Sequence, residues 1–219
     1  MEHVNITTED GVELHGLYRS AENARAAVLL LHMMPSTKES WDAFADGLEK
    51  IGLSSLAIDE RGHGESVMKN GEKIDYRDMD DQTEKKRDVE ASVAWLAKKT
   101  GLPFSKIAVV GASIGANLAI RYAYDHPECP AAVSLSPGLD YRGVRTPDAV
   151  EGMAEGLPVF IAVSSEDSAS AASVHELESL ETAANVETVI LEGAGHGTTM
   201  FEHDHAFMDA SIEWLSKRL

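Results

Sequence analysis

Ile107-Ala-Val-Val-Gly-Ala-Ser-Ile-Gly-Ala-Asn-Leu118 is the stretch that decides the fold. Its first four residues form a short apolar run rich in β-branched side chains, which predicts a buried strand. The small residues that follow predict a helix packed closely against a sheet. Gly111 and Gly115 flank Ser113 in a Gly-x-Ser-x-Gly pattern. Glycine on both sides allows a sharp strand-to-helix turn that holds the serine hydroxyl in the open.

Apolar runs and amphipathic stretches alternate on both sides of this turn. The alternation predicts an α/β fold, with a mostly parallel sheet covered by helices on both faces, as a single domain over residues 1–219. Asp10-Gly11 predicts a hairpin at the entrance to the sheet. Strands are predicted at 4–8, 12–18, 26–32, 53–58, 107–110, 131–135, 158–163 and 186–191, and helices at 37–51, 82–100, 114–126, 173–182 and 199–215. Residues 67–81 are predicted to form a loop and 137–156 an irregular segment.

Composition narrows the classes of function. The chain has 219 residues and a formal net charge of −18, so its surface repels nucleic acid and anionic membranes. Its single cysteine, Cys129, allows no intrachain disulfide and argues against a Cys-rich metal site. The polar start Glu2-His3 lacks a signal-peptide pattern, and no apolar run reaches membrane-spanning length. A cytoplasmic protein is therefore expected, and homo-oligomerisation stays open.

The chemically distinctive residues follow predicted strands, at the edge where open α/β sheets carry their sites. Ser113 needs a base to remove its proton, and His196, in a glycine-flanked loop after the last strand, is the candidate. Asp167, after the preceding strand, is the candidate to orient the imidazole, with Glu166 and Asp140 as alternatives. The backbone N–H groups of Met33 and Ile114 are the predicted oxyanion donors.

Three motifs then carry a resemblance. Gly-Ala-Ser-Ile-Gly, Asp-Glu-Arg-Gly-His-Gly-Glu-Ser and Gly-Ala-Gly-His-Gly resemble the α/β-hydrolase superfamily, nearest to its small lidless carboxylesterases and dienelactone-hydrolase-like members. The resemblance implies an eight-stranded sheet whose second strand is antiparallel. It also implies Ser113 as nucleophile, Asp167 as acid and His196 as base. The chain departs from many members at Met33, where they have glycine, and at Ser165. Ser113 stands where dienelactone hydrolases carry cysteine, which favours ordinary esters.

The expected function is hydrolysis of small carboxylic esters through an acyl-enzyme, with no metal and no organic cofactor. The segment 137–156 is too short for the helical lid of many relatives, which suits small soluble substrates. Substrate-lining positions are predicted at Met34, Tyr141, Val144 and Met153. A peptidase, a thioesterase or a non-catalytic binding protein of the same fold are the alternatives, because selectivity depends on the shape of the pocket.

Several polar residues have a plainer interpretation. His32, His63 and Arg61 are predicted to hold their turns in place. His203 and His205 are predicted to lie at a solvated surface and not to bind a metal. The charged run 84–88 is predicted to be a solvated helix face.

Overall fold

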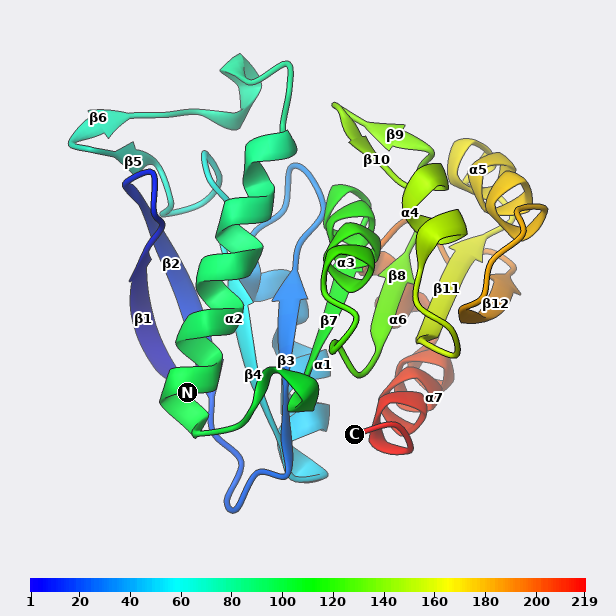
Figure 1. Ribbon diagram of the computed structural model, residues 1–219, viewed down its shortest axis with the longest axis horizontal. Coiled ribbons are helices and arrows are strands. Elements are labelled where there is room, and N and C mark those ends of the chain that lie inside the picture. Colours follow the sequence, from blue (N-terminus) through cyan, green and yellow to red (C-terminus); the bar gives the residue numbers. More distant parts are fainter.

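The computed structural model describes residues 1–219, which build one ten-stranded sheet (Figure 1). Eight strands make up most of it: β1 (Glu2–Thr7), β2 (Val12–Arg19), β3 (Ala26–Leu31), β4 (Leu53–Ile58), β7 (Ile107–Ala112), β8 (Ala132–Leu135), β11 (Pro158–Ser164) and β12 (Asn185–Leu191). The order is β12-β11-β8-β7-β3-β4-β2, with β1 on β2. The six strands from β12 to β4 run parallel, and β2 is antiparallel to both β4 and β1. The predicted α/β fold is confirmed.

One segment predicted as loop forms strands. β5 (Met68–Lys69) and β6 (Glu72–Lys73) form a hairpin of two short strands joined by a two-residue turn. β5 pairs with β2, so the hairpin extends the sheet. Asn70 and Gly71 form its turn with φ angles of 51° and 83°. Asn-Gly favours this tight turn. The prediction of a loop over 67–81 is therefore wrong for residues 68–73. A second hairpin, β9 (Asp140–Tyr141) and β10 (Val144–Arg145), lies outside the sheet.

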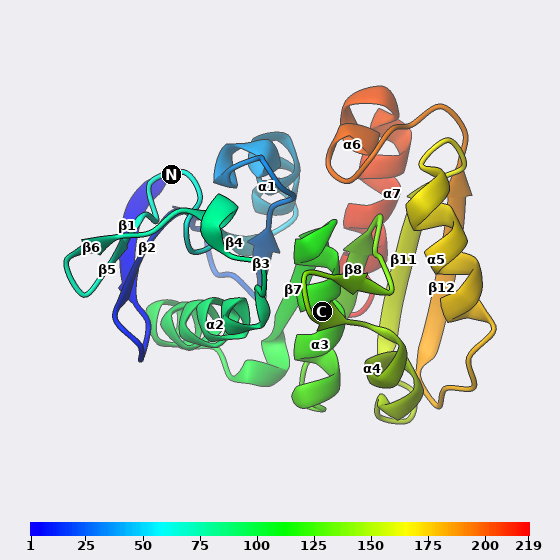
Figure 2. The same cartoon turned by 90° about the horizontal axis from the view of Figure 1, so that it is seen from above.

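Helices cover both faces of the sheet (Figure 2). They are α1 (Asp42–Lys50), α2 (Lys86–Thr100), α3 (Ile114–Asp125), α4 (Pro147–Gly152), α5 (Ser168–Glu178), α6 (Thr199–His203) and α7 (His205–Ser216). One hydrophobic core joins the sheet to α2, α3, α4 and α5, and the other joins it to α1, α6 and α7. No helix is long and apolar enough to cross a bilayer.

Two helix predictions are corrected. The helix predicted at 173–182 starts five residues earlier, directly after Asp167, because small and serine residues continue the helix toward the sheet. The predicted closing helix is broken at Asp204, whose carboxylate accepts a hydrogen bond from Phe207 N and starts α7. The Thr199 hydroxyl accepts a hydrogen bond from His196 N at 2.9 Å, which ties the start of α6 to the preceding loop.

A buried ionic layer holds the loop that follows β4. Lys85 Nζ lies 2.6 Å from Glu60 Oε2, and both side chains are fully buried. Arg61 Nε donates to Asp88 Oδ1 at 2.9 Å, and Asp88 is also fully buried. The prediction of a solvated face at 84–88 is therefore wrong for Lys85 and Asp88, because the start of α2 packs against this loop. Arg61 anchors the loop as predicted.

His63 belongs to the same layer and makes stability depend on pH. It is 2% exposed, its Nδ1–H donates to Arg61 O at 3.2 Å, and its ring stacks on Tyr76. Burial and the nearby Lys85 charge lower its pKa from 6.5 to about 3. Between these values the unfolded chain binds more protons than the folded one. The stability that neutral His63 contributes is therefore fully present above pH 6.5 and is lost as the pH falls toward 3.

Lowering the pH from 7.5 to 5 is expected to reduce the free energy of unfolding by about 2 kcal/mol through this histidine alone. His63→Gln, which stays neutral, should lose correspondingly less. Urea unfolding at both pH values measures the difference. His175→Gln is the control, because that side chain is 64% exposed. Equal pH slopes in the wild type and His63→Gln would contradict the assignment.

Candidate active site

Ser113 occupies a strained turn between β7 and α3. Its φ and ψ angles are 54° and −117°, a region that few non-glycine residues adopt. A Cβ on Gly111 would run into the backbone of Gly115, and a Cβ on Gly115 would approach Leu31 O to 2.5 Å. The predicted need for both glycines therefore has a direct steric cause. Strain of this kind is concentrated at functional sites.

Four loops meet at the carboxyl edge of the parallel strands, at the top of Figure 1. Met33 follows β3, Ser113 follows β7, Asp167 follows β11 and His196 lies in the loop after β12. Close contacts tie the histidine loop to the others. A Cβ on Gly197 would lie 3.2 Å from Ala112 Cβ, directly before Ser113, and 2.6 Å from Met33 Sδ. The predicted convergence of distant residues is thus present in the backbone.

A hydrogen bond between Asp167 and His196 joins two of these loops. Asp167 Oδ2 accepts from His196 Nδ1–H at 2.6 Å. This bond fixes the tautomer that leaves Nε2 unprotonated and able to accept a proton. The side chain of His196 is 37% exposed and that of Asp167 only 15%, so Asp167 is shielded while the imidazole can be reached.

The Asp167 carboxylate is stabilised as an anion. Burial by itself would raise its pKa, but hydrogen bonds from His196, Ser170 and Ser136 outweigh burial and hold the pKa below its usual value. Ser136 also accepts from Gly197 N at 3.0 Å and has a φ of 54°. It therefore joins the acid loop to the histidine loop. An ionised carboxylate in this position favours a proton on the imidazole.

The two alternative acids are engaged elsewhere. Glu166 accepts from Gly193 N and from Ser164 Oγ, each at 2.6 Å. Asp140 accepts from Gly143 N at 2.7 Å within the β9–β10 turn. Neither carboxylate contacts the imidazole, so Asp167 is the acid that the structure places on His196.

The Ser113 hydroxyl is not hydrogen-bonded to His196 in this structure. Its backbone N–H donates to Leu135 O at 2.8 Å. The structure thus brings Asp167 and His196 together and places the His196 loop beside Ser113. It does not form the hydrogen bond between His196 and Ser113. Rotation of a serine hydroxyl is fast, and such bonds are often formed only once substrate is bound.

The predicted oxyanion donor Met33 is held by His32. His32 Nδ1–H donates to Met33 O at 3.0 Å, and His32 Nε2 accepts from Glu60 N at 3.1 Å. Burial lowers the pKa of His32 and keeps it neutral, which suits both bonds. The N–H of Met33 donates to no other backbone group. At the other donor, Ile114, α3 begins, and the first N–H groups of a helix lack partners within the helix.

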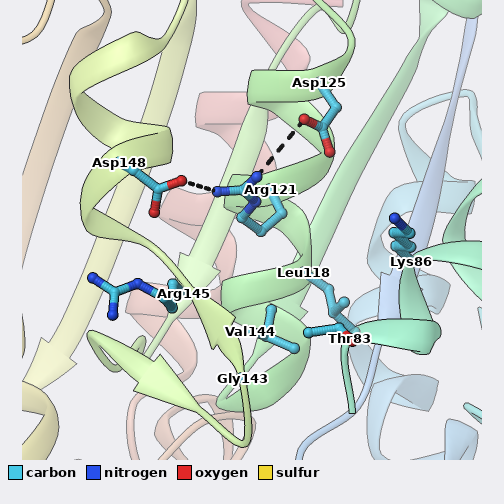
Figure 3. Close-up of a pocket in the computed structure, with 9 residues that line it drawn as sticks. All are labelled: Thr83, Lys86, Leu118, Arg121, Asp125, Gly143, Val144, Arg145 and Asp148. Atoms are coloured by element: carbon cyan, nitrogen blue, oxygen red, sulfur yellow. Dashed lines mark hydrogen bonds and ion pairs between the residues drawn. The ribbon is translucent and has the colours of Figure 1, made fainter. Parts of the chain in front are cut away.

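The predicted substrate-lining residues divide into two groups. Met34 and Tyr141 are half-buried, and Gln82 Nε2 lies 3.5 Å from Met34 Sδ. Val144 and Met153 are 4% and 3% exposed and pack in the core beside α3. Val144 also lines a cavity of about 360 Å³ between the start of α2, α3 and α4, which contains none of Ser113, Asp167 and His196 (Figure 3).

Sequence reasoning missed three polar residues that support this edge: Ser136, Ser170 and Asn117. Ser136 directly follows β8, so the rule that found Asp167 could also have found it. Asn117 lies one helical turn after Ser113, and Ser170 lies one turn after Asp167. Helical spacing could therefore have placed both residues near the site. His203 is likewise less free than predicted, because its ring bonds to Ala194 O at 3.1 Å.

Comparison with known proteins agrees with this fold. Residues 22–162 match the family described as "Serine aminopeptidase, S33" (Hydrolase_4). The matched range includes Met33 and Ser113 but ends before Asp167 and His196. Protein phosphatase methylesterase 1 of Mus musculus is 31% identical over 155 residues, 70% of this chain and 35% of that protein. The chain spans less than half the length of the curated relatives it matches.

Two solved structures show the same arrangement of strands and helices. An esterase of Pyrococcus furiosus has a TM-score of 0.80 at 22% identity, covering 99% of this chain and 90% of that one. A dienelactone hydrolase of Anabaena variabilis has a TM-score of 0.75 at 22% identity, covering 99% and 95%. With most of its length matched to the family and its whole length to the fold, the chain belongs to the Hydrolase_4 family of the α/β-hydrolase superfamily.

Proposed function

We propose that this protein is a serine esterase that hydrolyses small carboxylic esters through an acyl-enzyme. One observation supports this most strongly. Asp167 and His196 are joined at 2.6 Å, and the loop that carries His196 packs through Gly197 against Ala112, directly before the strained turn of Ser113. An oriented base next to a serine at a helix N-terminus is the combination that activates a hydroxyl nucleophile.

In this proposal, Ser113 Oγ attacks the ester carbonyl while His196 Nε2 takes its proton. The Asp167 carboxylate stabilises the imidazolium. The negative charge that develops on the carbonyl oxygen is bound by the N–H groups of Met33 and Ile114, close to the positive end of the α3 dipole. The alcohol leaves with the proton from His196. Water then attacks the acyl-enzyme by the same route in reverse and releases the acid.

An open site favours small esters. Between β8 and β11 the chain forms only the β9–β10 hairpin and the six-residue α4, which is too little for a lid domain. The names of two similar proteins, a methylesterase and an esterase, point the same way. The net charge of −18 disfavours polyanionic substrates.

An aminopeptidase is the second candidate, favoured by the name of the matched family. A panel of p-nitrophenyl esters of increasing acyl length, an acyl thioester and an aminoacyl anilide separates the two. We expect the highest kcat/KM for a short-chain ester. Faster cleavage of the anilide would replace the esterase proposal, and absence of turnover across the panel would favour a non-catalytic binding protein.

A further inference from the structure

The side chain of Met33 reaches the loop that carries His196. Its Sδ lies 4.0 Å from Thr198 Oγ1, and a Cβ on Gly197 would come within 2.6 Å of that sulfur and 3.6 Å of Met33 Cβ. Met33 is half-buried and packs against the core cluster that contains Ala194 of the same loop. One thioether therefore fills the space between the end of β3 and the residues directly after His196.

The loop 193–197 depends on such contacts because its backbone is rich in glycine. Its three glycines have φ angles between 58° and 82°, and glycine restrains the backbone less than any other residue. The hydrogen bonds from this loop to other segments all run toward the β8 and β11 side of the sheet. Their acceptors are Ser136, Ser164 and Glu166. On the β3 side, packing against Met33 holds the loop in place of hydrogen bonds.

The backbone of Met33 is fixed independently of its side chain. Met33 O accepts hydrogen bonds from His32 Nδ1–H at 3.0 Å and from Ser36 N at 2.8 Å. Both bonds remain when the side chain is shortened, so the N–H of residue 33, the proposed oxyanion donor, stays in place. Met33 thus combines two parts: a backbone anchored at the end of β3 and a side chain in contact with the loop of the proposed base.

We propose that Met33 is a positioning residue, whose side chain sets the separation between the oxyanion donor and His196. This inference rests on the proposed esterase function. The imidazole must reach the Ser113 hydroxyl while the carbonyl oxygen lies on the N–H of Met33, and a displacement of about 1 Å can cost a hundredfold in rate. A shorter side chain leaves a gap into which the glycine-rich loop moves, and this movement carries the imidazole out of line with Ser113.

Met33→Ala separates positioning from substrate binding. We expect kcat to fall by about tenfold to a hundredfold for p-nitrophenyl acetate, butyrate and hexanoate alike, with KM within about twofold of the wild type. The loss is independent of acyl length because every substrate needs the base in the same place. Met33→Leu fills a similar volume and should return kcat to within about threefold of the wild type. A changed preference for acyl length would instead make Met33 a wall of the acyl pocket and overturn the inference.

Met208→Ala is the matched control. Met208 is also half-buried and packs against the same core cluster, but from α7 and outside the four loops of the site. This variant should lower the melting temperature about as much as Met33→Ala does and keep wild-type kcat. An equal loss of kcat in the two variants would mean that core stability, and not the position of the His196 loop, controls turnover.

Gly197→Ala tests the contact from the loop side. Its methyl group would overlap Met33 Sδ, so kcat should fall, and the further loss should be at least about fivefold smaller in the Met33→Ala background, where the sulfur is gone. The strain of alanine at a φ of 58° is the same in both backgrounds and cancels. Losses that simply multiply, or wild-type kcat in Met33→Ala, would contradict the inference and leave the esterase proposal standing. A wild type that hydrolyses none of the three esters would refute both.

Discussion

Replacing Ser113 by alanine is expected to lower kcat for a short-chain p-nitrophenyl ester by about a millionfold, the loss seen when the nucleophile of such a triad is removed. The variant loses the only atom that can form the acyl-enzyme, while His196 and Asp167 keep their contact. Folding should be intact, because alanine fits the same turn and the Ser113 hydroxyl forms no hydrogen bond to His196 there. Steady-state kinetics together with circular dichroism measure both quantities.

Ser105→Ala is the control for this experiment, because Ser105 is exposed before β7 and far from the carboxyl edge of the sheet. It should keep wild-type kcat. If Ser113→Ala kept more than a few per cent of wild-type turnover, a different group would have to carry the acyl transfer.

Asp167→Asn is expected to lower kcat by about ten-thousandfold, the size of effect known for an orienting aspartate. An amide can present its N–H₂ to His196 Nδ1, which places the proton on Nε2 and leaves no base for Ser113. It also removes the charge that stabilises the imidazolium. The loss should fall on kcat more than on KM, because only 15% of the Asp167 side chain is exposed and it acts through His196.

Glu166→Gln gives the matched comparison. The two carboxylates are neighbours in sequence, and both changes replace an acid by its amide. Glu166 contacts Gly193 N and Ser164 Oγ and not the imidazole, so its amide should cost less than about tenfold. Equal losses in the two variants would mean that the effect comes from the charge of the loop and not from contact with His196.

Hydrophobic periodicity and glycine positions predicted most of the fold. Continuous apolar runs such as 26–31 could only be strands buried on both faces, and β3 is fully buried. The wrong predictions share one cause: a local sequence pattern does not show which distant residues a side chain will contact. The hairpin around Asn70-Gly71 pairs with Val12 and Glu13 at the start of β2, which β4 does not reach. Lys85 and Asp88 are buried because Glu60 and Arg61 lie opposite them across a long separation in sequence.

The candidate site was predictable where chemistry follows strand ends. Asp140, Glu166 and Asp167 all lie between Ser113 and His196 in the chain, so only the coordinates show that Asp167 is the one in contact with His196. Strand ends and helical spacing place Ser136, Ser170 and Asn117 near the site, but their partners lie on other segments of the chain, so the sequence does not predict their contacts. Val144 and Met153 look like pocket residues in the sequence because an apolar side chain in an irregular segment gives no sign of whether it turns inward.

The central claim is that His196, oriented by Asp167, activates Ser113. Labelling with a fluorophosphonate measures this most directly, because the probe reacts with an activated serine and is insensitive to the identity of the substrate. Intact mass and peptide mapping should find one adduct per chain, on Ser113, and none after Ser113→Ala or His196→Ala. An adduct on another residue, or an unlabelled wild type, would contradict the claim.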